Sequence, residues 1–352
     1  MFITGIGTAN PPQRYTQAEC WLAYQESKQF KQLDKRARAM LRKVLLAENG
    51  IRTRYFALNP LTEVFDATPD NLYKRFAQHA PALATQAAER ALRQAGHQAD
   101  EIDAVIISTC TGYLCPGLSS YVAERLGLRP DALGLDLVGQ GCGAALPNMR
   151  AAEALLAAKR CQRILSVCVE VCSAAFYIDN DPGVLISNCL FADGAAAVVL
   201  ADTPNQRSRQ IEWKETASRI DPLERDTLRF EQKNGMLRNI LTRPVPQLAA
   251  RNAELVLDEV LDKAGILRSQ ISTWIWHAGG RDVLTALQQQ LSLAAADLNW
   301  SSAVLSEFGN LSSPFVYFVL QKALKGNAPG GWWWLSSFGA GFSCHGALLE
   351  VL

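Results

Sequence analysis

The spacing of apolar residues predicts helices and strands that alternate along most of the chain. Residues 82–95 have the periodicity of a helix that ends at Gly96, and a mostly apolar, β-branched run follows at 102–108. This order predicts a helix, a glycine stop and a buried strand. A second helix and a second strand are predicted at 144–158 and 163–169.

The same order returns in the second part of the chain. A helical stretch at 254–264 ends at Gly265, and a strand is predicted at 271–276. Both the glycine stop and the strand recur at an offset of 169 residues. A helix at 315–324 and a strand at 332–336 match the second pair of the first half. We therefore interpret the chain as an internal duplication.

Two similar α/β halves predict a layered architecture with mostly parallel sheets covered by helices on both faces. We place the first half at 1–206, with a helical cap at 13–68, and the second half at 207–352. The segment 207–247 is polar, rich in arginine and punctuated by proline. It predicts a connecting strand and a loop over a site.

Composition narrows the function classes. The chain has 352 residues, of which 49% are hydrophobic and 20% charged, with a net charge of +1. We interpret lysine and arginine as scattered along the chain, so we predict no positively charged surface that would bind nucleic acid or a membrane. No apolar run of about 18 residues and no signal peptide are evident, so we expect no membrane span and a cytoplasmic protein.

The cysteines do not predict a disulfide framework. Nine are spread over a long chain, and most would be small buried residues in a reducing compartment. Two cysteine pairs could suggest a zinc site: Cys110 with Cys115, and Cys168 with Cys172. Neither pair is accompanied by a second cysteine or histidine pair at the spacing of a zinc finger. No metal site is expected.

Cys142 is the candidate nucleophile. It lies in a glycine-rich turn at 139–145, between the predicted strand 133–138 and the helix 144–158. Backbone N–H groups at a helix N-terminus stabilise a thiolate, and flanking glycines let a substrate carbonyl approach the backbone. A structural cysteine at a tight turn explains this motif equally well.

The second half favours the catalytic interpretation. The repeat offset carries Cys142 to within one residue of Asn310, which again precedes a helix. His277 follows the strand 271–276 directly, at the sheet edge where open α/β proteins bind ligands. The other histidines are expected to be structural or on the surface: His79, His97 and His345.

Cysteine, histidine and asparagine in this order also describe a papain-like hydrolase. That family has its cysteine near the mature N-terminus, whereas Cys142 is in mid-chain. The duplication has no place in a papain-like fold.

Four motifs resemble the thiolase superfamily and, within it, the chalcone synthase-like type III polyketide synthases of bacterial type. They are Gly141–Ala144, His277–Gly280, Gly309–Ser313 and Leu190–Ala197, the last with Phe191 as a gatekeeper. The resemblance covers nearly the whole chain. It implies a thiolase fold, with duplicated βαβαβ halves in α-β-α-β-α layers, and a homodimer.

The resemblance also implies a mechanism. A Cys142 thiolate, paired with imidazolium His277, takes an acyl group from acyl-CoA or from an acyl carrier protein. His277 and Asn310 then stabilise the enolate that malonyl-CoA forms on decarboxylation. The extended chain would close to a resorcinol or a pyrone, with Ser312 facing the cavity and no bound cofactor.

Departures from the family pattern concern the substrate cavity. Ala175 stands where the family has a threonine, and Cys115 stands where a methionine reaches across the dimer. Phe338 and Ala340 belong to a C-terminal loop that differs from the plant motif. Smaller side chains would favour a bulky or long-chain starter. The second gatekeeper falls within 235–246 and cannot be assigned.

Three basic residues are near positions where the family contacts CoA: Arg42, Lys43 and Arg52. Gly279 and Gly280 are further candidates for contact with CoA. A ketoacyl synthase III shares the three chemical residues and resembles 50–54. The Phe191 segment, the motif at 309–313 and the absence of a basic patch for an acidic carrier favour the polyketide synthase. A noncatalytic partner subunit would lack one of the three residues.

Overall fold

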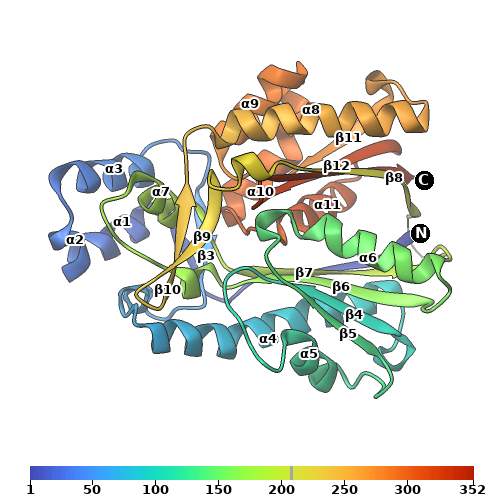
Figure 1. Cartoon of the computed structure of the whole chain (residues 1–352), viewed down its shortest axis with the longest axis horizontal. Coiled ribbons are helices and arrows are strands. Elements are labelled where there is room, and N and C mark those ends of the chain that lie inside the picture. Colours follow the sequence, from blue (N-terminus) through green and yellow to red (C-terminus); the bar gives the residue numbers. More distant parts are fainter. Residues whose placement is uncertain (207–208) are drawn as a thin grey trace.

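The computed structural model describes residues 1–206 and 209–352 (Figure 1). The expected boundary between the halves, and the start of the expected 207–247 segment, fall on residues outside this description. The strands are β1 (Phe2–Ala9), β2 (Arg14–Thr16), β3 (Thr53–Tyr55), β4 (Ala104–Ser108), β5 (Leu133–Leu137), β6 (Arg163–Glu170), β7 (Gly194–Ala201), β8 (Ile211–Ile220), β9 (Leu228–Lys233), β10 (Met236–Leu241), β11 (Ile271–Trp276), β12 (Gly331–Gly339) and β13 (Ser343–Val351).

Helices connect most of these strands. They are α1 (Gln17–Glu26), α2 (Lys28–Gln32), α3 (Lys35–Leu46), α4 (Pro69–Ala95), α5 (Leu118–Leu126), α6 (Ala145–Ala157), α7 (Pro182–Leu190), α8 (Val245–Ala264), α9 (Arg281–Leu291), α10 (Asn299–Phe308) and α11 (Phe315–Lys325). Within the described ranges, no helix combines the length and the apolar character that crossing a membrane requires.

One nine-stranded sheet runs in the order β11-β12-β13-β8-β1-β7-β6-β4-β5. Its two halves meet where β1 pairs with β8, at Phe2 and Glu212. The parallel pairs are β4 with β5, β4 with β6, and β11 with β12, whereas the others are antiparallel. The expectation of mostly parallel sheets is therefore wrong, because β7 and β13 return beside β6 and β12 without a crossover to the far side.

Five layers follow from the helix positions. Helices α6 and α11 contact strands of both sheet halves and lie between them, as Figure 1 shows. Helices α4 and α5 cover the outer face of one half, and α8 with α9 covers the other. The layered α-β-α-β-α architecture is confirmed, and it directs the N-terminal ends of α6 and α11 into the middle of the molecule.

Local signals account for the helix ends. Thr68 caps α4 by accepting a hydrogen bond from Asn71 N, and Pro69 occupies the first turn. Gly96 and Gly265 end α4 and α8 with positive φ angles of 75° and 66°. Both helices start earlier than predicted. The missed part of α4 is polar and contains Pro81, and the first turn of α8 contains Pro246, so neither start stands out as a helical pattern.

The expected cap consists of α1, α2 and α3, which enclose an apolar cluster together with α7. The described part of the expected 207–247 segment contains β8, which joins the main sheet. It also contains the two-stranded β9–β10 hairpin, which packs against α7. A hairpin therefore replaces the simple loop that the sequence predicted.

Candidate active site

Cys142 lies on a single 3-10 turn, Gly141–Gly143, that leads into α6. Gly141 has a φ of 56°, a conformation that favours glycine. A Cβ atom at this position would also lie 3.0 Å from the backbone nitrogen of Ala340. The turn therefore needs glycine both for its backbone conformation and for its close approach to the C-terminal loop.

A chain of hydrogen bonds joins the three chemical motifs. Ser312 Oγ donates to Cys142 Sγ at 3.2 Å, and Ser312 N donates to Asn310 Oδ1 at 2.8 Å. Asn310 Nδ2 donates to the carbonyl oxygen of Gly279 at 3.0 Å, two residues after His277. Segments that are far apart in sequence thus meet at the N-terminal ends of α6 and α11.

His277 is 2% exposed and lies in an aromatic setting. Its ring packs edge-on against Phe315 and Phe338, with centroids 5.2 and 6.4 Å away, and Nδ1 has no hydrogen-bond partner. Phe338, expected in the cavity wall, thus contacts the imidazole instead.

Burial sets the protonation states of the thiol and the imidazole. It lowers the pKa of His277 to about 3. It raises the pKa of the Cys142 thiol to about 12, although the hydrogen bond from Ser312 acts in the opposite direction. Burial thus disfavours the charged form of both side chains and opposes the ion pair that the resemblance implies.

Glu170, at the buried end of β6, was not predicted from the sequence. Its carboxylate accepts hydrogen bonds from Ser313 Oγ at 2.6 Å, Thr111 Oγ1 at 2.9 Å and Cys110 N at 3.0 Å. Ser312 Oγ lies 3.4 Å from it. Burial raises the pKa of Glu170, and its hydrogen bonds oppose this rise. An acidic residue ending an otherwise apolar strand was the available signal.

A cavity begins at Cys142 and contains about 1020 Å³ of empty space, counting the part open to solvent. Four of the expected cavity residues line it together with the nucleophile: Phe191, Ala175, Ser312 and Ala340. Cys115 is exposed in the single chain and does not line this cavity. His277 and Asn310 are each 2% exposed and are not among the residues that line the cavity.

The cavity continues into the cap, which the sequence did not predict. We call this part the inner arm. It is lined by side chains of α1 and of the 3-10 helix Leu61–Phe65: Cys20, Ala23, Tyr24, Leu61, Val64 and Phe65. Nearly all of these contacts are apolar.

The β9–β10 hairpin forms another wall. Leu228 and Phe230 of β9 and Asn239 of β10 line the cavity. Asn239 Nδ2 donates to Ser187 Oγ on α7 at 2.8 Å. Asn239 belongs to the 235–246 segment, in which no gatekeeper could be assigned from sequence.

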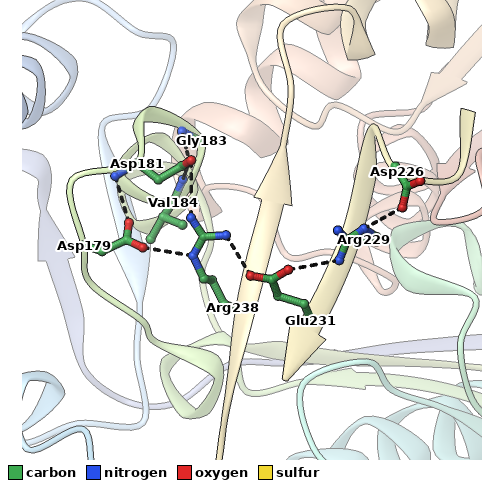
Figure 2. A network of polar contacts seen from close by, with 8 residues as sticks. All are labelled: Asp179, Asp181, Gly183, Val184, Asp226, Arg229, Glu231 and Arg238. Atoms are coloured by element: carbon green, nitrogen blue, oxygen red, sulfur yellow. Dashed lines mark hydrogen bonds and ion pairs between the residues drawn. The ribbon is translucent and has the colours of Figure 1, made fainter. Parts of the chain in front are cut away.

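Ion pairs fasten this hairpin to the loop that precedes α7 (Figure 2). The side chain of Arg238 is only 11% exposed and lies against Asp179 at 2.9 Å, Glu231 at 2.9 Å and Asp181 at 3.3 Å. Arg229 contacts the other carboxylate oxygen of Glu231 at 3.3 Å. The hairpin wall of the cavity is therefore held by a largely buried guanidinium as well as by packing.

The expected CoA contacts lie outside the cavity lining. Arg42 and Lys43 are exposed on α3, and Arg52 is exposed with its Nε donating to Ser306 Oγ at 2.9 Å. Gly279 and Gly280 lie in the loop after β11, where Gly279 accepts the hydrogen bond from the catalytic candidate Asn310.

The prediction that lysine and arginine are scattered is wrong for the cap. Residues 28–43 contain seven lysines and arginines and one acidic residue, so the segment carries a net charge of +6. The rest of the chain then carries −5, since the whole has +1. The net charge of the whole chain, +1, therefore does not reveal that positive charge gathers in the cap.

Comparison with known proteins decides the family. Residues 9–216 match the family model described as FAE1/type III polyketide synthase-like protein. Residues 224–352 match the model for the C-terminal domain of chalcone and stilbene synthases. The chain belongs to the type III polyketide synthase family. This places it with the polyketide synthases rather than with ketoacyl synthase III or papain-like hydrolases.

Relatives of this type III polyketide synthase extend over its whole length. It is 29% identical to a 3,5-dihydroxyphenylacetyl-CoA synthase of Streptomyces toyocaensis, over 99% of this chain and 89% of the relative. The crystal structure of PKS-I from the brown alga Ectocarpus siliculosus superposes with a TM-score of 0.91 and 26% identity, covering 99% and 98% of the two chains. The 1,3,6,8-tetrahydroxynaphthalene synthase of Streptomyces coelicolor, at 23% identity, a TM-score of 0.88 and coverage of 99% of both chains, shares the fold.

Proposed function

We propose that this type III polyketide synthase loads an acyl-CoA starter on Cys142 and extends it with malonyl-CoA by decarboxylative Claisen condensation. Cyclisation of the chain then gives a resorcinol- or pyrone-type product. The hydrogen-bonded chain from Cys142 through Ser312 to Asn310, at the head of the cavity, carries this proposal.

Loading begins from the neutral pair. The neutral imidazole of His277 accepts the proton of the Cys142 thiol, and the resulting thiolate attacks the thioester carbonyl of the starter. The C–S bond to CoA breaks, CoA leaves as its thiol after taking the proton, and the acyl group stays on Sγ. The Ser312 hydroxyl stabilises the thiolate each time Cys142 is released.

Extension uses two hydrogen-bond donors. His277 and Asn310 Nδ2 stabilise the enolate oxygen that forms as malonyl-CoA loses carbon dioxide, and one such donor is worth roughly 3 kcal/mol. The bond from Ser312 N to Asn310 Oδ1 supports this proposal, because it fixes the orientation of the carboxamide. No metal or bound cofactor takes part, since the CoA thioester supplies the acidity and the leaving group.

The inner arm supports a long-chain or bulky starter. Ala175 is small at the wall shared with Cys142, and the apolar residues of α1 offer contact area to an acyl tail. We expect loading to improve with acyl chain length, and A175L to reduce loading of long starters at least tenfold and of acetyl-CoA less than twofold. A154L, on the exposed face of α6, is the matched control. Exclusive use of short or aromatic starters would contradict this proposal.

Product masses test the reaction itself. The enzyme is incubated with a starter panel and malonyl-CoA as the sole extender, and the number of two-carbon additions is read from each mass. We expect several additions and a cyclised product, and none with C142A. A single addition, or dependence on malonyl-acyl carrier protein, would support a ketoacyl synthase III reaction instead.

We also propose a homodimer that forms through β5. Among the described residues this strand pairs only with β4. Leu133 at its start is 41% exposed, and Val138, the residue after its end, is 61% exposed. An edge strand with exposed apolar residues favours pairing with another chain. Exposed Cys115 would then lie beside the partner's cavity. Light scattering should give twice the chain mass for the wild type and a monomer for V138K.

Two further proposals concern the contacts with CoA and the location of the protein in the cell. Arg42, Lys43 and Arg52, with Gly279 and Gly280, would contact the CoA moiety. A cytoplasmic location suits the nine cysteines, all of which are free.

A further inference from the structure

The cap carries a strongly positive outer surface formed by α2 and α3. Helix α3 buries Ala37, Leu41 and Leu45 toward the cap cluster. Its outward side holds cations at helical spacing, and α2, which precedes α3 directly in the chain, holds two more. We call it the basic face: Lys28, Lys31, Lys35, Arg36, Arg38, Arg42 and Lys43. Figure 1 shows α2 and α3, in blue, at the outer end of the molecule.

None of these seven cations has an ion pair or a side-chain hydrogen bond among the described residues. Elsewhere arginines are commonly paired, as Arg129, Arg238 and Arg268 are. Six of the seven are exposed and Arg38 is partly so. Like charges at helical spacing repel one another, so an anionic partner would stabilise this surface.

The extent of the basic face indicates a protein partner. Helix α3 has 12 residues and is therefore about 18 Å long, and α2 lengthens the surface further. The phosphates of one CoA molecule form a more compact group than this. The exposed apolar residues beside the basic face are Leu22 and Leu46, without the exposed aromatic side chains that anchor interfacial helices in membranes.

The basic face is also on the side of the catalytic loop. Just beyond the end of α3, the carbonyl oxygen of Glu48 accepts a hydrogen bond from Arg281. Arg281 follows directly after the loop that holds His277 and Gly279. The C-terminal end of α3 therefore lies against the residue that directly follows this loop.

We propose that the basic face docks an acidic acyl carrier protein, which delivers the starter on its phosphopantetheine thiol. The acyl group passes from that thioester to Cys142, and the carrier leaves with a free thiol that takes up the proton from Cys142. This inference rests on the proposed function, since it names the macromolecular donor for the same loading step. Opposite charges along a helix steer association and accelerate it.

The experiment compares two donors of one acyl group. Octanoyl-acyl carrier protein and octanoyl-CoA are each mixed with the full chain, and acylation of Cys142 is followed by mass spectrometry. The variant K28E/K31E/K35E reverses three charges outside the proposed CoA contacts Arg42, Lys43 and Arg52. The control R93E/R125E/R160E reverses three exposed, unpaired cations elsewhere by the same total charge.

We expect the variant to load at least tenfold more slowly from the carrier protein and within twofold of wild type from octanoyl-CoA. Rising salt should slow carrier loading of the wild type in the same way, and the control should resemble the wild type. Equal carrier loading in the variant and wild type overturns the inference, as does loading of the wild type from CoA alone. Binding to anionic vesicles that the variant abolishes, without carrier loading, would assign the surface to membranes. Failure to load from either donor would instead refute the proposed function.

Discussion

Replacing Ser312 with alanine should make Cys142 a weaker nucleophile. The Ser312 hydroxyl donates to Cys142 Sγ at 3.2 Å and lowers the pKa of a thiol that burial raises to about 12. A hydrogen bond to a charged group contributes about 1.5–3 kcal/mol. One pKa unit corresponds to about 1.4 kcal/mol, so S312A should raise the thiol pKa by about one to two units.

Alkylation kinetics measure this change. The rate of iodoacetamide addition to the Cys142 peptide follows the thiolate fraction, so at a fixed pH it should fall about tenfold to a hundredfold in S312A. S313A is the matched control, because Ser313 Oγ donates to Glu170 at 2.6 Å and not to Cys142. Equal alkylation rates in S312A and wild type, across the pH range, would refute the stabilising role of Ser312.

Three further predictions concern the surroundings of the site. Burial lowers the pKa of His277 to about 3, so this residue contributes stability that is present above pH 6.5 and is lost as the pH falls toward 3. Thermal melts of H277Q over this pH range should lack that loss. Melting curves that shift with pH in parallel with the wild type would contradict this prediction. R238M should lower the free energy of unfolding, measured in urea, by roughly 2–3 kcal/mol, because three carboxylates lose a largely buried partner. The control R229M replaces a side chain that is 35% exposed and should lower it by less than about 1 kcal/mol. G339A would place a Cβ 2.2 Å from Gln140 O, next to the turn that carries Cys142. We expect the free energy of unfolding to fall by about 1–3 kcal/mol and the acylation of Cys142 to slow. Unchanged stability and acylation would show that the turn adapts to the added methyl group.

Much of the fold could be predicted because its signals are local. The glycine stops at Gly96 and Gly265 and the buried strand Ile271–Trp276 were read directly from periodicity. The direction of a strand relative to its neighbours has no local signal of this kind. Whether β7 or β13 runs parallel to its neighbour depends on how the chain returns to the sheet, which a pattern of apolar residues does not encode.

The site divides in the same way. Cys142 and Asn310 were found because the duplication places both at helix N-termini, and the structure links them through Ser312. The inner arm comes from α1 and a short 3-10 helix that precede the nucleophile by some 80 to 120 residues. No local motif marks such residues, because only the tertiary packing of the cap brings them to the cavity.

Mass spectrometry of the Cys142 peptide tests the central claim most directly. The enzyme is mixed with octanoyl-CoA, quenched and digested, and the experiment is repeated after malonyl-CoA is added. The account predicts an octanoyl group on Cys142 alone among the nine cysteines, and its conversion to extended product once malonyl-CoA is present. An unmodified Cys142, or an acyl group on another cysteine that malonyl-CoA then consumes, would contradict it.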